Sequence, residues 1–152
     1  DKVKGSVFTK MAKAITIAVK KGGGVEEAVA RARSVNMPKD NIDRAIAKGM
    51  GREGGVELVE LTIEAFGPEG VMILIEAVTD NRNRTVAELR SLLEKHGGRM
   101  GKLGSVAYAF DKSDQGYLPK FTMPVTQREQ VEELLEIISE HDDVQEVYVN
   151  LA

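Results

Sequence analysis

The chain has 152 residues, 42% hydrophobic and 30% charged, an ordinary composition for a protein with one or two small cores. It contains no cysteine, which excludes disulfides and thiolate metal sites, and no tryptophan and few aromatic residues, which argues against a base-stacking platform. No apolar run approaches the roughly 18 residues of a membrane span and no secretory leader pattern opens the chain, so we expect a cytoplasmic protein without a membrane partner.

The net charge of −3 conceals an asymmetry along the chain. Residues 1–52 carry twelve Lys and Arg against five Asp and Glu, whereas residues 53–152 carry nine against nineteen. A basic segment joined to an acidic one favours contact of the basic segment with a polyanion. The alternative interpretation is that these cations only solvate helix faces.

Residues 1–52 are predicted to form a basic domain of three helices. Apolar residues at helical spacing over residues 8–19, followed by three glycines, predict the first helix. A second helix is predicted over residues 25–34, and a third from near Pro38 to just before Gly49. The candidate polyanion contacts on the first helix are Lys10, Lys13, Lys20 and Lys21.

Residues 53–112 are predicted to form an α+β domain in the order ββαβ. Residues 56–66 alternate, which predicts a half-buried strand with Glu60, Thr62 and Glu64 on its polar face. Residues 71–78 are apolar on both faces, as in a central strand. A helix ending at Gly97 and a strand over 104–110 complete this domain.

Residues 113–152 are predicted to form the remaining part of a second α+β domain, in the order βαβ. Thr126 and Glu129 have the spacing of a capping box, which predicts the start of a helix there. The fold class expected for the whole chain is therefore α+β: a three-helix domain followed by two α/β-sandwich domains with mostly antiparallel sheets, the second one incomplete.

Two arginines one residue apart stand in the segment TDNRNRT, residues 79–85. We expect Arg82 and Arg84 in a short turn between the central strand and the next helix. A helix start offers free N–H groups and the positive end of the helix dipole, and arginine binds phosphate with two parallel hydrogen bonds. The alternative is that Asp80 pairs with one arginine while the asparagines only shape the turn.

A second candidate phosphate loop is KHGGRMGKLGS, residues 95–105. It contains four glycines, which allow close approach of the backbone to a phosphate, together with Arg99 and Lys102. We expect the two loops at opposite ends of one helix, where they would serve separate contacts on a long polyanion.

Catalytic and metal-binding patterns are not evident in this chain. Its two histidines are His96, at a predicted helix end, and His141, in the turn EHDDV, where three adjacent ligands rarely converge on a metal. The common nucleophile, zinc-protease and nucleotide-loop motifs do not occur. We expect no enzyme activity, no catalytic residue, no metal, no cofactor and no small-molecule substrate.

Six segments resemble the YebC/PmpR family, which includes the mitochondrial translational activator of cytochrome oxidase. They are FTKMAKAITIAVKKGGG, NMPKDNIDRAI, FGPEGV, TDNRNRTVAELR, HGGRMGKLGSVAYAF and DDVQEVYVN. The resemblance implies a helical domain and two α+β domains in a cytoplasmic protein without catalytic residues. It also implies more residues before Asp1, between Gly24 and Val25 and near 112–117, so we expect that segments of a longer chain are missing there.

The family offers two functions for this chain. One is a transcriptional regulator that binds DNA. The other is a ribosome-associated translation factor that eases synthesis through proline runs and contacts rRNA or tRNA. We expect a non-enzymatic nucleic-acid-binding regulator of gene expression, with DNA or the ribosome as its partner, whose contacts are the four lysines of the first helix with Arg82, Arg84, Arg99 and Lys102.

Overall fold

The computed structural model describes residues 2–52 and 54–152, with side chains from Ser6 onward. The domain boundary predicted at residue 53 therefore lies outside the described residues. The chain divides into two compact units, one formed by residues up to 60 with 78–81, the other by residues 61–77 and 82–152. No helix in the described part of the chain is long and apolar enough to cross a membrane.

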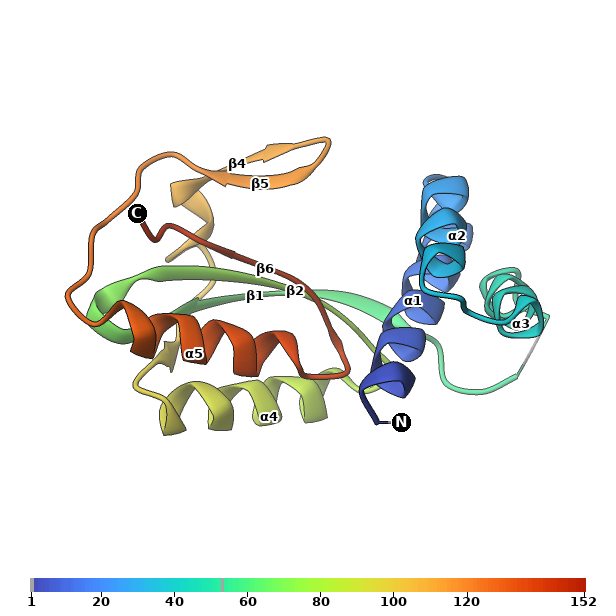
Figure 1. Ribbon diagram of the computed structural model, residues 1–152, viewed down its shortest axis with the longest axis horizontal. Coiled ribbons are helices and arrows are strands. Elements are labelled where there is room, and N and C mark those ends of the chain that lie inside the picture. The colour runs from blue at the N-terminus through green and yellow to red at the C-terminus, as the bar shows by residue number, and fades with distance from the viewer. Residues whose placement is uncertain (1, 53) are drawn as a thin grey trace. The chain divides into compact units, whose positions relative to one another are not determined.

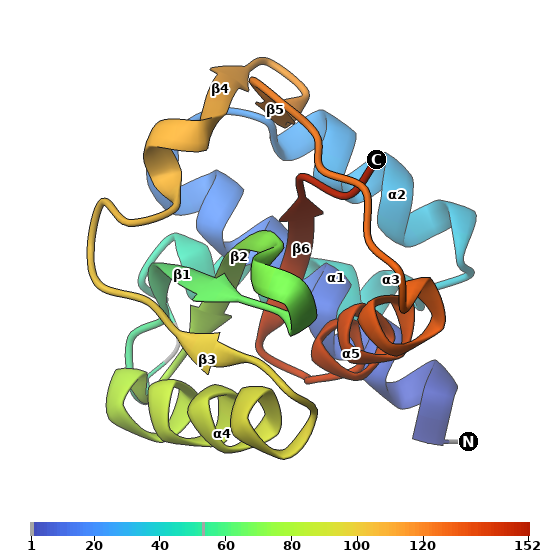
Figure 2. The same cartoon turned by 90° about the vertical axis from the view of Figure 1, so that its left-hand side faces the viewer.

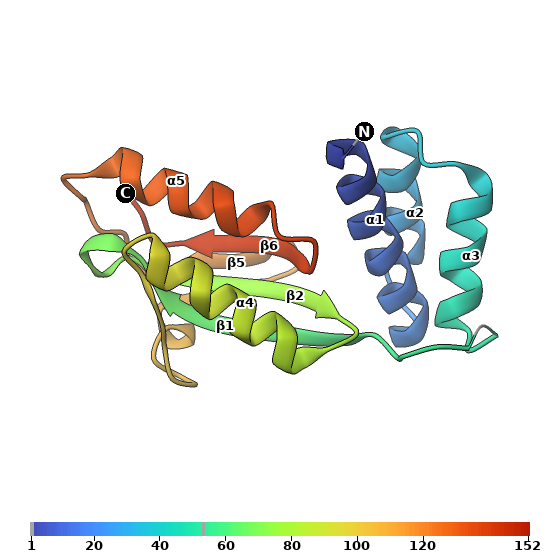
Figure 3. The same ribbon diagram turned by 90° about the horizontal axis from the view of Figure 1, so that it is seen from below.

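Three helices form the first unit, as predicted: α1 (Lys2–Lys21), α2 (Val25–Ser34) and α3 (Lys39–Gly49) (Figure 3). The apolar stripe of α1 packs on the two shorter helices because its residues recur every three or four positions. The buried side chains of this core are Ile15, Ala18, Ala28, Ala32, Met37, Ile42 and Ala45.

The second unit contains a four-stranded sheet in the order β3-β1-β2-β6. Its strands are β1 (Val59–Phe66), β2 (Met72–Thr79), β3 (Arg99–Met100) and β6 (Val144–Val149). β1 pairs antiparallel with β3, and β2 pairs antiparallel with β6. A separate hairpin consists of β4 (Phe110–Ser113) and β5 (Gly116–Pro119).

Both faces of this sheet are covered. Helices α4 (Arg82–Lys95) and α5 (Arg128–Ser139) lie on one face, and the β4–β5 hairpin lies on the other (Figures 1 and 2). Leu89, Leu93 and Leu134 pack on the helical side, while Leu74 packs with Phe110 on the hairpin side. This two-sided cover explains why β2 is apolar on both faces, and it confirms the prediction of a central strand.

The α+β class with mostly antiparallel sheets is confirmed, but the structure does not separate residues 113–152 from 53–112. α5 and β6 complete the sheet that β1 and β2 begin. A central strand needs a hydrogen-bonded neighbour on each side. β1 supplies one neighbour of β2, and β6 supplies the other, with Ile75 opposite Val147.

The strand predicted over residues 104–110 is wrong. A short 3-10 helix, Ala107–Ala109, occupies this segment, and β4 begins only at Phe110. Glu64, predicted on the polar face of its strand, is instead 6% exposed. Its carboxylate accepts hydrogen bonds from the backbone of three residues in the segment: Gly104, Val106 and Ala107. Those N–H groups are therefore not available to a sheet ladder.

The predicted capping box at Thr126 and Glu129 is also wrong. No side chain of the local sequence caps α5. Glu69, in the turn between β1 and β2, accepts from the amides of Thr126 and Gln127 over 2.9 and 3.0 Å and from the Thr126 hydroxyl over 2.9 Å. A distant carboxylate thus satisfies N–H groups that precede the helix.

The two positions at which missing segments were expected lie beside regular secondary structure, α2 and the β4–β5 hairpin. Gly24 precedes α2 with a left-handed backbone, φ 78°, and its carbonyl accepts from the amide of Ala28 over 3.1 Å. Residues 112–117 form the turn of the β4–β5 hairpin, where Lys112 pairs with Tyr117 and Ser113 with Gly116.

Candidate nucleic-acid interface

Two of the four lysines predicted as contacts on α1 hold the segment that follows α3. Lys20 Nζ lies 2.7 Å from Glu57 Oε1 and donates to the carbonyl of Leu58 over 2.9 Å, while Lys21 lies 3.2 Å from Glu60. These pairs offset part of the positive charge of Lys20 and Lys21. Lys10 and Lys13 lie half-buried further along the same helix.

A groove of about 410 Å³ lies in the helical unit, and its cations come from two helices. Lys13 is contributed by α1, and Arg44 and Lys48 by α3, together with one acidic residue, Asp80. Among the described residues, the side chains of Arg44 and Lys48 make no hydrogen bond or ion pair. The groove is therefore cationic, and two of its three positive groups are available to an anion.

Sequence analysis did not single out Arg44 and Lys48. Their signal was present, because residues four apart on a helix lie on the same face. The apolar positions Ile42 and Ala45 fix which face of α3 is buried, and Arg44 and Lys48 lie beside that face, at the groove.

The prediction that Arg82 and Arg84 lie in a short turn before the helix is wrong. α4 begins at Arg82, so both arginines occupy its first turn. No acidic residue stands in the first turn of α4. Arg82 is exposed, and its side chain has no ion pair within the described residues. This placement gives an anion access to a cation beside the positive end of a helix dipole.

Arg84 is engaged in contacts within the protein. Its Nη2 donates to Asp143 Oδ2 over 2.8 Å, and its Nε lies 3.5 Å from Glu88 Oε1. Asp143 is only 3% exposed and accepts a second hydrogen bond from the Thr85 hydroxyl over 2.6 Å. Arg84 therefore neutralises a buried carboxylate, which fixes the position of its guanidinium.

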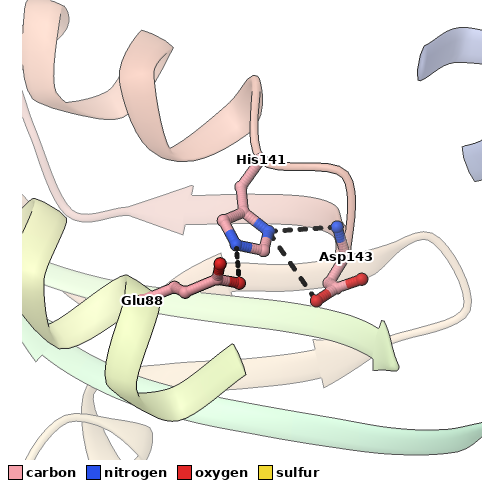
Figure 4. Close-up of side chains that lie close together, drawn as sticks. All are labelled: Glu88, His141 and Asp143. Carbon is pink, nitrogen blue, oxygen red and sulfur yellow. Dashed lines mark hydrogen bonds and ion pairs between the residues drawn. The ribbon is translucent and has the colours of Figure 1, made fainter. Parts of the chain in front are cut away.

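Glu88, His141 and Asp143 approach one another (Figure 4), and Arg84 pairs with both carboxylates. His141 Nε2 lies 3.1 Å from Glu88 Oε1, and the amide of Asp143 donates to His141 Nδ1 over 3.1 Å. Because Nδ1 accepts a hydrogen bond, the neutral ring carries its proton on Nε2 and donates it to Glu88. One ligand atom from each of the three lies within 4.8 Å of the others, a spacing that could hold a metal ion.

This cluster fits a cation poorly. Asp143 Oδ2 already accepts from the Arg84 guanidinium and the Thr85 hydroxyl, and a metal ion there would be repelled by the arginine. The hydrogen bonds of His141 are complete without an ion. We interpret the cluster as a polar network that joins α4 to the turn before β6.

Arg99 and Lys102 lie beyond the other end of α4. The Arg99 guanidinium carbon stands 4.3 Å from the centroid of the Phe66 ring, and Lys102 is exposed. The 14 residues of α4 separate this loop from Arg82 by about 20 Å of helix. The two arginine-containing segments are therefore at opposite ends of one helix, as predicted, and only an extended ligand could contact both.

Glu64 organises the loop that contains Lys102. Burial alone would raise the pKa of the Glu64 carboxyl, but the backbone N–H groups of Ala107, Gly104 and Val106 outweigh that effect, and its pKa lies below the usual value. The carboxylate is therefore ionised at neutral pH and holds the loop in one conformation.

Two family models match the chain. Residues 1–52 match the N-terminal domain of TACO1/YebC proteins, and residues 58–115 match a model of their second and third domains. The chain belongs to the TACO1/YebC family. The family predicted from the six sequence segments is thereby confirmed.

The chain is also similar to curated proteins that carry the same name as one another. A "probable transcriptional regulatory protein" of Treponema denticola is 50% identical over 119 residues, which cover 74% of this chain and 48% of the relative. One from Geotalea uraniireducens is 47% identical over 127 residues, covering 79% of this chain and 51% of the relative. The chain therefore spans about half the length of the curated relatives it matches.

A solved structure shares the TACO1/YebC fold of this chain. The crystal structure of a conserved hypothetical protein, Aq1575 from Aquifex aeolicus, superposes with a TM-score of 0.88 at 27% identity. The match covers 97% of this chain and 90% of that one. The elements of this chain thus follow a known protein fold.

Proposed function

We propose that this chain is a non-enzymatic regulator of gene expression that acts in the cytoplasm and binds nucleic acid, with duplex DNA as its first candidate partner. The names of its relatives, probable transcriptional regulatory proteins, support the regulatory part of this proposal. The observation that carries the binding part is the groove with Arg44 and Lys48, two cations without a partner among the described residues.

The proposed contact is electrostatic. A phosphate backbone binds lysine and arginine mainly through release of its counterions, so affinity falls steeply as salt rises. The basic helices would supply most of these contacts, and the exposed Arg82, Arg99 and Lys102 would add others. Among the helices that the structure describes, none has the features of a familiar DNA-recognition motif, so sequence discrimination would come from the shape of the DNA.

A salt titration of DNA affinity tests this proposal. Fluorescence anisotropy of a labelled duplex would give the slope of log affinity against log salt for the wild type and for Arg44→Ala/Lys48→Ala. We expect the slope to flatten by about two charge units in the double variant. Lys39→Ala is the matched control: it removes a lysine of α3 that lies outside the groove and pairs with Asp43 at 2.8 Å. An unchanged slope in the double variant would contradict the role of the groove.

The ribosome is the second candidate partner, and the surface of α5 favours it. Five glutamates of this helix and its end are exposed: Glu129, Glu132, Glu133, Glu136 and Glu140. Such a surface is repelled by duplex DNA but suits contact with basic ribosomal proteins. Co-sedimentation with ribosomes in the presence of excess duplex DNA separates the two partners. Pelleting that resists the DNA would favour the ribosome, and pelleting that is lost would favour DNA.

A further inference from the structure

Leu103 is the most exposed large hydrophobic residue among those the structure describes. Its exposed fraction is 97%, whereas the other exposed large hydrophobic residues range from 42% to 64%. The side chain stands in the loop between β3 and the 3-10 helix Ala107–Ala109, and it packs against no part of the described chain. Single exposed leucines are common, so its setting decides whether it has a role.

The loop that carries Leu103 is held in place on both sides. Before Leu103, the amide of Gly101 donates to the carbonyl of Glu64 over 2.8 Å. After it, the amides of Gly104 and Val106 donate to the Glu64 carboxylate over 2.7 and 2.8 Å. The Ser105 amide donates to the Lys102 carbonyl over 3.0 Å and closes the turn around Leu103.

Gly101 shows how closely this loop is fitted to the sheet. A Cβ at this position would lie 2.6 Å from the Ser105 hydroxyl oxygen and 3.0 Å from a ring carbon of Phe66. The loop therefore holds the backbone at Leu103 in one conformation, and little backbone entropy would be lost when this residue is bound.

The segment that carries Leu103 is basic in sequence, unlike residues 53–152 as a whole, and the Glu64 carboxylate bonded to it offsets only one of its positive charges. Residues 95–105 contain Lys95, Arg99 and Lys102 and no Asp or Glu, although acidic residues outnumber basic ones by nineteen to nine over residues 53–152. An apolar side chain within a cationic loop complements a partner that is itself negatively charged and has an apolar interior. Stacked bases enclosed by phosphates have this character.

We propose that Leu103 is a wedge that inserts between stacked bases of duplex DNA, with Lys102 and Arg99 on the flanking phosphates. This inference rests on the proposed DNA binding. Leu is among the side chains that part base steps in this way, at pyrimidine–purine steps, which unstack most easily. Glu64 acts as a positioning residue, because its carboxylate is bonded to the loop amides and acts on the DNA only through the loop.

The test uses the full chain and a short duplex with 2-aminopurine beside a TpA step. Wild-type binding is expected to raise 2-aminopurine fluorescence, because the base is unstacked. Leu103→Ala is expected to lose this signal and to bind about tenfold more weakly, with an unchanged salt slope since no charge is removed. Leu103→Met should retain both, because methionine also serves as a wedge.

Leu118→Ala is the matched control. Leu118 is also a leucine exposed on the second unit, at 64%, but it lies in β5, away from the cationic loop in sequence. The wedge is overturned if Leu103→Ala binds and brightens the probe as the wild type does, or if Leu118→Ala has the same effect as Leu103→Ala. A wild type without salt-dependent DNA binding would overturn both the wedge and the proposed function, whereas normal salt dependence without a Leu103 effect removes the wedge alone.

Discussion

Arg84 on α4 and Asp143 before β6 form an ion pair of 2.8 Å that joins residues 59 positions apart. The Asp143 side chain is 4% exposed, while that of Arg84 is 43% exposed. The pair thus has one buried and one solvent-accessible member. The same arginine that the sequence marks as a phosphate ligand also stabilises the fold, so its two roles must be separated by experiment.

Arg84→Ala should lower the free energy of unfolding, because it leaves the buried Asp143 carboxylate with fewer donors. We expect a loss of about 1–2 kcal/mol, less than for a fully buried ion pair, because Arg84 is partly exposed. Arg82→Ala is the control and should stay within about 0.5 kcal/mol of the wild type. Urea unfolding measures both, and equal stabilities of the two variants would contradict the structural role of Arg84.

The proposed contact of Arg82 and Arg84 with a polyanion is tested by the salt dependence of binding affinity. Arg82→Ala together with Arg84→Ala should weaken polyanion binding and flatten the salt slope by roughly one to two charge units. Arg82→Ala alone should account for about one unit, because Arg82 has no ion pair within the described residues. If neither variant changes the slope, the start of α4 does not contact the ligand.

Gly98 is required by close packing at the end of α4. A Cβ at Gly98 would lie 2.5 Å from the carbonyl oxygen of Phe66, a backbone atom that cannot rotate away. Gly98→Ala should therefore destabilise the fold by about 2–3 kcal/mol. Gly23→Ala is the control, because no atom lies within 4 Å of its added Cβ. Thermal unfolding should separate the two variants, and a Gly98→Ala melting curve like that of the wild type would refute the close contact.

The helices and the central strand could be predicted from the spacing of apolar residues along the sequence. The three helices and α5 follow from apolar residues at helical spacing, and α5 buries Val131, Leu134 and Ile138 as that spacing requires. The central position of β2 followed from its two apolar faces. These predictions succeeded because burial of one helix face, or of both strand faces, is a property of neighbouring residues.

The failures involve partners far apart in the chain. Nothing near residues 104–110 indicates that their amides bind a carboxylate about 40 residues earlier, so a strand was wrongly predicted there. Likewise Thr126 and Glu129 have the spacing of a capping box, but the amides of Thr126 and Gln127 donate to the Glu69 carboxylate instead. Both errors arise because a carboxylate competes with the local partner for the same N–H groups.

The candidate site also combines residues that could be predicted from their neighbours in sequence with contacts that depend on distant parts of the chain. Arg82, Arg84, Arg99 and Lys102 could be singled out because they stand in asparagine- or glycine-containing segments whose backbone does not itself require a cation. The engagement of Arg84 with Asp143 could not be foreseen, since it depends on the return of the chain to the sheet at β6. The α1–α3 groove required the packing of two helices before Arg44 and Lys48 could be grouped with Lys13.

The acid stability of the protein should depend on Glu64. Its folded-state pKa is below 4.5, so its ionised carboxylate stabilises the fold fully above pH 4.5, and this contribution is lost as the pH falls through the folded-state pKa. Glu64→Gln removes the charge but keeps the shape. We expect it to lower stability by about 1–3 kcal/mol at neutral pH, where three N–H groups lose an ionised acceptor.

The difference between wild type and Glu64→Gln should shrink as the pH is lowered well below 4.5, because the wild-type carboxyl then becomes protonated too. Urea unfolding at neutral and at acidic pH measures this convergence. Glu129→Gln is the control, since it removes the carboxylate of an exposed glutamate on α5 and leaves Glu64 in place. A gap that stays constant at all pH values would mean that the Glu64 charge does not hold the loop, and the fixed position of Leu103 would then need another cause.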